Sequence, residues 1–312
     1  MKIIFMGTPD FAACALEKLA QSRHEIELVV TKPDCYRGKN KSAYSEVKEV
    51  ALKHDLPLYQ PEKIKDSESV SKLYEYKPDV IVVIAYGQML SKDILTLPKY
   101  GCVNVHASLL PKYRGAAPIQ WAVLNGEEVT GVTTMRMDEG MDTGDIIMQQ
   151  EYRLDPKETS GTLFDKLMEE GGELLLKTLD ALEDGTATFT KQDESKATKT
   201  KMIRKEMGAI DFNKSAEELK HFVYGMTPWP SAYTGYGGKK LKLFDVEVVD
   251  SLGDIEAIPG KVAKVEKDMF YIGTGSGFLG VLSLQLEGKR VMTTDEFLRG
   301  NKIEEGDMFN DI

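Results

Sequence analysis

An amide and an imidazole stand two residues apart in the middle of the sequence. Asn104 and His106 belong to the stretch Asn-Val-His-Ala-Ser-Leu-Leu-Pro, which follows a short apolar run. Because alternate residues of a strand point to the same side, this spacing predicts both side chains on one face. An imidazole exchanges protons near neutral pH, and an amide N–H can donate to a developing oxyanion. The pair is therefore either a candidate site or a structural histidine beside a structural asparagine.

An acidic segment further along the chain offers a partner for His106. Residues 138–146 read Asp-Glu-Gly-Met-Asp-Thr-Gly-Asp-Ile, with four acids and two glycines. The spacing does not match the calcium loop of an EF-hand. Two interpretations stay open: an ordinary hairpin loop, or a loop whose carboxylate orients and polarises His106.

The turn Gly7-Thr-Pro-Asp10 lies between an expected strand and an expected helix. Phosphate groups bind at such turns when the sequence carries G-x-G-x-x-G, which is missing here. We interpret the segment as a tight turn with Asp10 capping the helix. Its sequence argues against a nicotinamide-dependent dehydrogenase.

These residues need elements to position them, and the first half alternates between strand and helix patterns. Strands are expected at 2–6, 25–31, 79–85, 101–106, 132–137 and 146–152, and helices at 11–20, 45–54, 67–76 and 160–183. The alternation predicts an α/β fold with a mostly parallel sheet covered on both faces. Asn104 and His106 fall at the carboxyl end of a strand, where such sheets bind ligands.

The second half changes character. Residues 190–205 are polar, rich in Lys and Thr, and without a clear period, which is typical of a linker. A helix is expected at 215–224 and a short one at 293–299. Five short segments with glycine turns predict a small β-barrel, at 232–236, 239–248, 260–266, 269–274 and 278–285. We therefore expect two domains, 1–189 and 208–312, joined by a linker over 190–207.

The composition is that of a soluble globular protein. Of the 312 residues, 42% are hydrophobic and 29% charged. The two 18-residue stretches without Asp, Glu, Lys or Arg, 221–238 and 269–286, are broken by glycine and polar residues, which argues against a membrane span. The apolar run at the N-terminus is too short for a signal peptide, so we expect a cytoplasmic protein. Three cysteines without C-x-x-C spacing fit neither a disulfide framework nor a structural zinc site.

The net charge of −10 is unevenly spread. Residues 191–242 carry eleven Lys and Arg against six Asp and Glu, and residues 32–53 carry six against three. Screening cuts off distant charges within about 10 Å, so each segment can hold a polyanion locally. The alternative is two solvated, lysine-rich surfaces.

Taken together, the segments resemble the folate-dependent formyltransferases. Gly-Thr-Pro at 7–9, the Asn-x-His-x-Ser-Leu-Leu-Pro stretch and the Asp-x-Gly-x-Asp-Thr-Gly-Asp-Ile stretch occur in that family's order. The stretch 108–120, Met-Thr-Pro-Trp-Pro-Ser-Ala-Tyr at 226–233 and Thr-Asp-Glu-Phe-Leu-Arg-Gly at 294–300 are similar to the branch that acts on methionyl-tRNA. The resemblance covers nearly the whole chain.

The resemblance implies a Rossmann-like catalytic domain and a C-terminal barrel of the oligonucleotide-binding (OB) type. It implies 10-formyltetrahydrofolate as co-substrate, no metal, and Asn104, His106 and Asp142 as catalytic residues. Asn104 would stabilise the oxyanion, and His106 with Asp142 would move protons. The implied folate-site residues are Ser108, Leu109, Leu110, Pro111, Tyr86 and Gly87.

The implied partner is initiator methionyl-tRNA, formylated by what we expect to be a monomer. The implied tRNA contacts are Arg37, Lys39 and Lys41 in the loop after residue 31, with Lys201 and Lys239 in the second half. Trp229, between two prolines, is either a stacking platform or a packed hinge. The alternatives are a formyltransferase acting on a nucleotide sugar or another small amine, a formylfolate hydrolase, and an inactive RNA-binding module.

Overall fold

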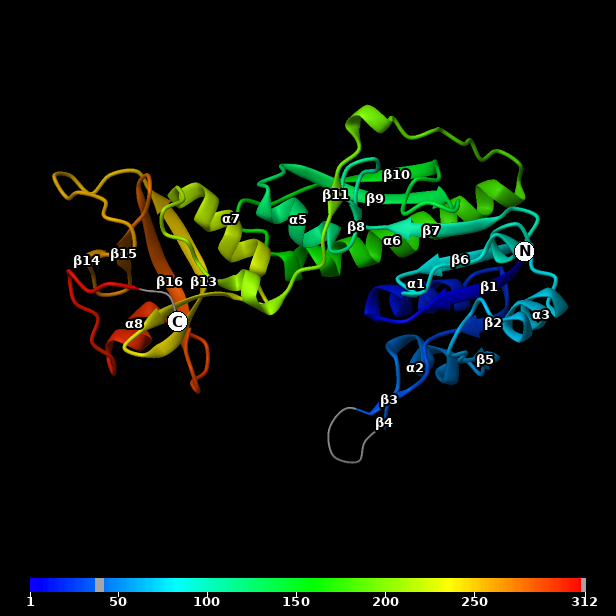
Figure 1. The fold of residues 1–312 in the computed structure, drawn as a ribbon, viewed down its shortest axis with the longest axis horizontal. Helices are drawn as coiled ribbons and strands as arrows, with labels where there is room; N and C mark the ends of the chain where they lie inside the picture. Colours follow the sequence, from blue (N-terminus) through cyan, green and yellow to red (C-terminus); the bar gives the residue numbers. More distant parts are fainter. Residues whose placement is uncertain (37–41, 310–312) are drawn as a thin grey trace. The chain divides into compact units, whose positions relative to one another are not determined.

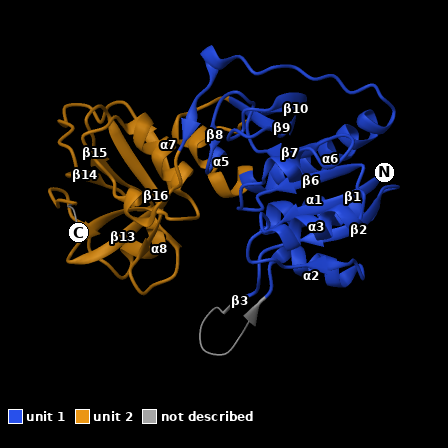
Figure 2. Cartoon of the chain, turned by 45° about the vertical axis from the view of Figure 1, so that its right-hand side comes forward, with its two compact units in different colours: residues 1–118, 129–153, 164–200 blue, residues 119–128, 154–163, 201–312 orange. Residues whose placement is uncertain are grey.

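The computed structural model describes residues 1–36 and 42–309. The chain forms two compact units, coloured separately in Figure 2. Unit 1 contains residues 1–118, 129–153 and 164–200. Unit 2 contains residues 119–128, 154–163 and 201–312. Unit 2 therefore takes two short pieces from the first half of the chain in addition to the whole second half.

A seven-stranded sheet forms the centre of unit 1 (Figure 1). Its strands are β1 (Lys2–Gly7), β2 (Glu25–Val30), β5 (Leu58–Tyr59), β6 (Val80–Ile84), β7 (Cys102–His106), β9 (Val129–Arg136) and β10 (Asp145–Arg153). The order across the sheet is β10-β9-β7-β6-β1-β2-β5. The strands from β5 to β7 are parallel, and β9 and β10 are antiparallel to their neighbours. The predicted mostly parallel sheet is confirmed.

Helices cover this sheet on both faces, as the alternation predicts. The helices of unit 1 are α1 (Asp10–Ala20), α2 (Glu46–Lys53), α3 (Ser67–Glu75), α4 (Lys92–Leu95) and most of α6 (Ser160–Glu183). On one face, Phe11 of α1 meets Phe164 of α6 with ring centroids 5.7 Å apart. On the other face, Leu73 of α3 and Ile94 of α4 join the apolar cluster beneath β1 and β6. All five residues of β6 are buried, as its unbroken apolar sequence predicts.

The turn after β1 is tight, as expected, but Asp10 does not cap the helix. Asp10 is the first residue of α1, and Pro9 occupies the capping position without a side-chain hydrogen bond. The Asp10 carboxylate instead accepts from the N–H of Phe11 at 3.1 Å. A Cβ on Gly7 would lie 2.6 Å from the Ala12 Cβ, so strand and helix approach too closely for a larger residue.

The segment after α6, expected as a linker, lies along unit 1. Thr190 forms a bridge with Ile146, and residues 194–196 form a 3₁₀ turn, η1 (Glu194–Lys196). The short strand β11 (Lys199–Thr200) then pairs in parallel with β8 (Arg114–Gly115). We call residues 190–200 the strap. Its polar sequence has no apolar period because it is held by hydrogen bonds rather than by core packing.

Unit 2 is built around an antiparallel sheet. Its elements are α5 (Pro118–Leu124), η2 (Lys205–Gly208), α7 (Ala216–Met226), β12 (Ala232–Tyr236), β13 (Lys239–Val249), β14 (Val262–Val265), β15 (Phe270–Gly273), β16 (Phe278–Leu286), β17 (Met292–Thr293) and α8 (Thr294–Leu298). The strands run β12-β13-β16-β15-β14, with β17 beside β16. Ser215 begins α7 with a capping box to Glu218. The expected α/β fold with a small OB-like C-terminal domain is confirmed.

None of the helices within residues 1–36 and 42–309 is both long and apolar enough to span a bilayer.

Candidate active site

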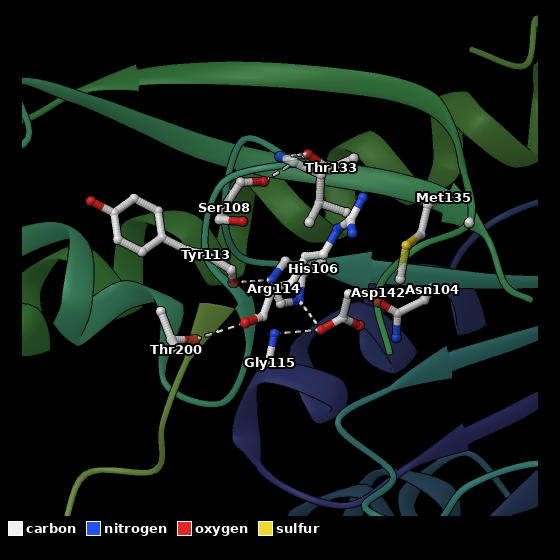
Figure 3. Close-up of polar contacts among 12 residues, drawn as sticks. Asn104, His106, Ser108, Tyr113, Arg114, Gly115, Thr133, Met135, Asp142 and Thr200 are labelled. Atoms are coloured by element: carbon white, nitrogen blue, oxygen red, sulfur yellow. Dashed lines mark hydrogen bonds and ion pairs between the residues drawn. The ribbon is translucent and has the colours of Figure 1, made fainter. Parts of the chain in front are cut away.

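His106 ends β7 with its ring almost completely buried (Figure 3). Its Nε2 lies 2.9 Å from the carbonyl oxygen of Tyr113. Because a carbonyl can only accept, Nε2 carries a proton, and in the neutral ring Nδ1 is left as a lone pair. That nitrogen faces the carboxylate of Asp142, with 3.7 Å between Nδ1 and Oδ2. The fold thus fixes the tautomer and leaves the basic nitrogen toward the acid.

Asp142 approaches His106 from the loop between β9 and β10. Its φ is +55°, a left-handed conformation that non-glycine residues rarely adopt. Its Oδ2 accepts from the backbone N–H of Gly115 at 2.8 Å. A neutral imidazole nitrogen and a carboxylate oxygen are both acceptors, and 3.7 Å exceeds a hydrogen bond. The gap between Nδ1 and Oδ2 can therefore be bridged in two ways: by a ligand N–H that donates to both atoms, or by a proton bound to Nδ1.

Asn104 lies two residues before His106 on β7, opposite Met135 of β9. Its Nδ2 donates to the carbonyl oxygen of Val83 on β6 at 2.9 Å. Its Oδ1 is buried, and none of the described residues provides a hydrogen bond to it. A buried amide oxygen without a partner is costly, so it marks a place where a ligand can donate. Val83 accepts one of the two N–H bonds of Nδ2, and the other is the donor expected from the sequence.

The Ser108–Pro111 segment is fixed from within the protein. Ser108 is fully buried, and its hydroxyl donates to the carbonyl of Lys112 at 2.7 Å. The hydroxyl of Thr133 on β9 donates to the Ser108 carbonyl and accepts from the N–H of Leu110. The Leu110 side chain is buried as well. Leu109 and Pro111 keep partly exposed side chains, whereas the buried side chains of Ser108 and Leu110 hold the shape of the loop.

Tyr86 and Gly87 follow β6 and differ in where they lie. The Tyr86 ring is buried in the apolar cluster with Leu90 and Leu95, and burial raises the pKa of its hydroxyl to about 12. Its Oη has no hydrogen-bond partner among the described residues. Gly87 is exposed at φ +76°, where a Cβ would lie 2.5 Å from the Lys32 Nζ. Gly87 is therefore required by the turn, and Tyr86 packs in the core.

A pocket rich in methionine opens beside Asp142, and the sequence analysis did not identify it. It lies between the loop after β6 and the loop after β9. The lining residues are Gln88, Met89, Leu90, Leu95, Met135, Met137, Asp138, Gly140, Met141, Asp142, Thr143 and Gly144. Methionines are also common in ordinary cores, so their presence alone gave no signal. The sequence clue was the position of 88–90 after a buried parallel strand, at the sheet edge that binds ligands.

Cys102 shares a strand face with Asn104 and His106 but is not available as a nucleophile. Its thiol is fully buried beneath α4, and desolvation raises its pKa to about 12. We expect Cys102→Ala to keep turnover within about 2-fold, since the thiolate is the reactive form. The lost packing should cost about 1–2 kcal/mol of unfolding free energy. Steady-state kinetics and thermal unfolding check both; a large loss of turnover at full stability would contradict this expectation.

The residues expected to contact tRNA are only partly within the description. Arg37, Lys39 and Lys41 lie outside the described residues. Lys201 and Lys239 are exposed, both in unit 2. In the part of the chain that the structure describes, no group of three or more His, Cys, Asp or Glu side chains is arranged to hold a metal ion.

Comparisons with solved structures show the fold. An N-formyltransferase from Helicobacter canadensis, in complex with folinic acid and dTDP-3-aminofucose, superimposes with a TM-score of 0.68. It is 19% identical and covers 90% of this chain and 98% of its own. HypX from Aquifex aeolicus, in complex with tetrahydrofolic acid, reaches a TM-score of 0.60 at 17% identity, over 98% of this chain and 50% of that one.

Comparisons of sequence show the family in addition to the fold. Residues 1–179 match the family described as formyl transferase, and residues 202–302 match its C-terminal domain. The methionyl-tRNA formyltransferase of Agathobacter rectalis is 51% identical over 310 residues, 99% of each chain. That of Alkaliphilus oremlandii is 44% identical over the full length of both. The chain therefore belongs to the formyl transferase family, in its methionyl-tRNA formyltransferase branch.

Proposed function

We propose that this protein transfers the formyl group of 10-formyltetrahydrofolate to the α-amino group of methionyl-initiator tRNA. The observation that carries the proposal is the facing pair of His106 Nδ1 and Asp142 Oδ2 beside an apolar pocket at the carboxyl end of β7. The full-length relatives, which bear the name of this activity, support the choice of acceptor.

The reaction makes demands that these side chains fit. The amine attacks the formyl carbon as the neutral base, which costs little because the pKa of an α-amino group is near 8. As the new C–N bond forms, the nitrogen must lose a proton and the formyl oxygen gains negative charge. His106 Nδ1 and Asp142 Oδ2 both face the place where an N–H can donate, so they take the proton. They return it to N10 as the C–N10 bond breaks.

Asn104 offers one hydrogen-bond acceptor and one hydrogen-bond donor at this place. Its unpartnered Oδ1 can accept from the incoming amine, and the N–H that Val83 does not use can donate to the formyl oxygen. Because Val83 fixes Nδ2, the amide is oriented before the ligands arrive. A preorganised donor stabilises developing charge without rearrangement during the reaction.

We propose that the pocket beside Asp142 receives the folate. Methionine side chains are polarisable and adapt to a flat ring, and most of the lining is apolar. When bound, the folate supplies the formyl carbon and N10 as the leaving nitrogen. We propose that the Ser108–Pro111 loop adds a wall through Leu109 and Pro111, and that the exposed turn at Gly87 lets the ligand approach the backbone.

The test is a formylation assay with purified protein, 10-formyltetrahydrofolate and initiator tRNA charged with methionine. We expect N-formylmethionine to be released on mild hydrolysis of the tRNA, at a rate proportional to enzyme. The alternative acceptor is an amino sugar nucleotide, because the structural relative from Helicobacter canadensis holds one with the same fold. Formylation of that sugar with no reaction on tRNA would overturn the proposed acceptor.

Exposed lysines are proposed to hold the tRNA through its phosphates. We expect the double variant Lys201→Ala, Lys239→Ala to weaken binding of initiator and elongator tRNA alike, because phosphate contacts carry no sequence information. The slope of log K against log salt should flatten by roughly 0.7–0.9 for each lost contact.

Lys63 and Lys65, exposed on unit 1, provide the matched control. Their double alanine variant removes the same charge and should keep the wild-type slope in the same filter-binding titrations. Equal slopes for all three proteins would place the phosphate contacts elsewhere.

We propose further that the protein acts as a monomer in the cytoplasm, with residues 1–189 as catalytic domain, 190–207 as connection and 208–312 as tRNA-binding domain. The two matched family regions support this division. Sedimentation of the purified protein checks the oligomeric state.

A further inference from the structure

Asp142 holds an uncommon backbone conformation, and the strap supplies what holds it there. A left-handed φ at a non-glycine residue persists only where surrounding contacts determine it. The carbonyl oxygens of Asp142 and Gly144 both point to one side-chain amide. Gln192 Nε2 donates to Asp142 O at 2.8 Å and to Gly144 O at 2.7 Å. A single NH₂ group thus spans the turn that carries the acid.

The orientation of the Gln192 amide is itself fixed. Its Oε1 accepts from Nε of Arg114 at 2.9 Å, so its NH₂ must face the Asp142 turn. Arg114 is only 2% exposed and makes a bidentate contact with Glu194, at 3.0 and 2.7 Å. Gln192 is therefore a relay between a buried guanidinium and the acidic turn.

The same Arg114 is joined to the other end of Asp142. The residue after it, Gly115, donates its backbone N–H to the Asp142 carboxylate at 2.8 Å. The position of that N–H is fixed by the pairing of β8 with β11 in the strap, where Thr200 Oγ1 donates to the Arg114 carbonyl (Figure 3). The strap thus reaches the Asp142 backbone through Gln192 and the Asp142 carboxylate through Gly115.

From this closed set of contacts we propose that Gln192 is a positioning residue for catalysis. Its amide holds the Asp142 turn so that Oδ2 stays directed at His106 Nδ1. The inference rests on the proposed role of Asp142 in proton transfer. It assigns a catalytic purpose to a segment whose sequence reads as a polar linker.

The informative variant is Gln192→Glu. A carboxylate has the same shape and still accepts from Arg114, but it has no N–H to donate to Asp142 O and Gly144 O. We expect kcat to fall by about 10–50-fold, because a small displacement of a proton-transfer group has effects of this size. The KM for methionyl-tRNA should change by less than about 3-fold, since Gln192 does not line the pocket and its amide is engaged by Arg114 and the Asp142 turn. Gln192→Ala should likewise lower kcat while leaving the KM for methionyl-tRNA nearly unchanged.

Glu194→Gln is the matched control. It also alters a partner of Arg114, yet Glu194 makes no contact with the Asp142 turn and is largely exposed. We expect it to lower the Tm by an amount similar to Gln192→Glu while kcat stays within about 2-fold. All assays are made well below the Tm of each variant, so that only folded protein is compared. Equal losses of kcat in both variants would mean that the strap serves stability alone and would overturn the proposal.

A double-mutant cycle separates this inference from the proposed function. If Gln192 acts only through Asp142, adding Gln192→Glu to Asp142→Asn should lower kcat by less than about 2-fold further. The same 10–50-fold loss in that background would show an independent effect and overturn the inference. If Asp142→Asn alone keeps full turnover, the role of Asp142 fails first. If Asp142→Asn loses turnover but Gln192→Glu does not, only the positioning role fails.

Discussion

Asp142→Asn and His106→Ala are each expected to lower turnover by about 10²–10⁴-fold, the range for groups that transfer protons in the transition state. An asparagine at 142 can still accept from the Gly115 N–H through its amide oxygen, so the loop keeps its anchor. It cannot take the proton that the attacking amine releases. Alanine at 106 removes the only basic nitrogen that faces the acid in the described site.

The measurement is single-turnover formylation with saturating folate and charged tRNA, together with circular dichroism of each variant. Folding should be nearly unaffected in Asp142→Asn, because asparagine keeps the contact to Gly115, whereas His106→Ala removes a buried ring and should lower the Tm. Glu139→Gln gives the control, since it removes an exposed acid three residues earlier in the same loop. Near-normal turnover in either site variant would remove that residue from the mechanism, and a loss in Glu139→Gln would point to charge rather than to proton transfer.

Asn104→Ala is expected to lower turnover by roughly 10²–10³-fold, as the loss of an oxyanion donor does. The affinity for folate should change much less, because the donor matters most when charge develops. Asn104→Asp keeps an acceptor oxygen but replaces Nδ2, so it loses both the contact to Val83 and the N–H for the formyl oxygen. We expect it to be at least as impaired as the alanine variant.

Folate binding by fluorescence, measured beside kcat at saturation, separates the two roles of Asn104. A ten-fold weaker complex with unchanged kcat would make Asn104 a binding residue and would remove it from the chemistry.

The large elements of the fold were predictable because each combines a period with clear ends. The unbroken apolar run of β6 indicates a strand covered on both faces, and it lies at the centre of the parallel sheet. The 24 residues of α6 match their predicted bounds. By contrast, β8 and β11 have two residues each and form only because segments far apart in the sequence pair with each other. No local sequence pattern therefore predicts these two strands.

The candidate site was predictable in its residue types but not in its hydrogen bonds. The strand period places Asn104 and His106 on one side, and the structure agrees. That Nδ2 of Asn104 is engaged by Val83 depends on which strand lies next to β7, which the sequence of β7 does not encode. Tyr86 was expected at the folate, and its buried ring packs with Leu90 and Leu95, which line the pocket beside Asp142. Its burial was not predictable, because a strand followed by a turn does not reveal which side its first side chain takes.

Gln192 was missed for a different reason. Sequence patterns detect apolar periodicity, and the strap has none, since its contacts are made by polar side chains to carbonyl oxygens and to a buried guanidinium. The burial of Arg114 in β8 shows that its charge requires partners somewhere in the chain, but that burial is visible only in the structure.

The interrupted make-up of unit 2 has a consequence for how the chain matures. Residues 119–128 and 154–163 leave the ribosome well before residues 201–312, on which their packing depends. Ser160 donates to the carbonyl of Thr227 at 2.6 Å, and Lys157 pairs with Asp245 at 3.1 Å. Until those later residues are synthesised, apolar side chains such as Ile119 and Val123 lack their final surroundings. The nascent first half therefore carries two segments whose packing partners are not yet made, and 119–128 exposes apolar side chains, which favour aggregation in newly made chains. The second half later folds onto these segments as part of the same chain.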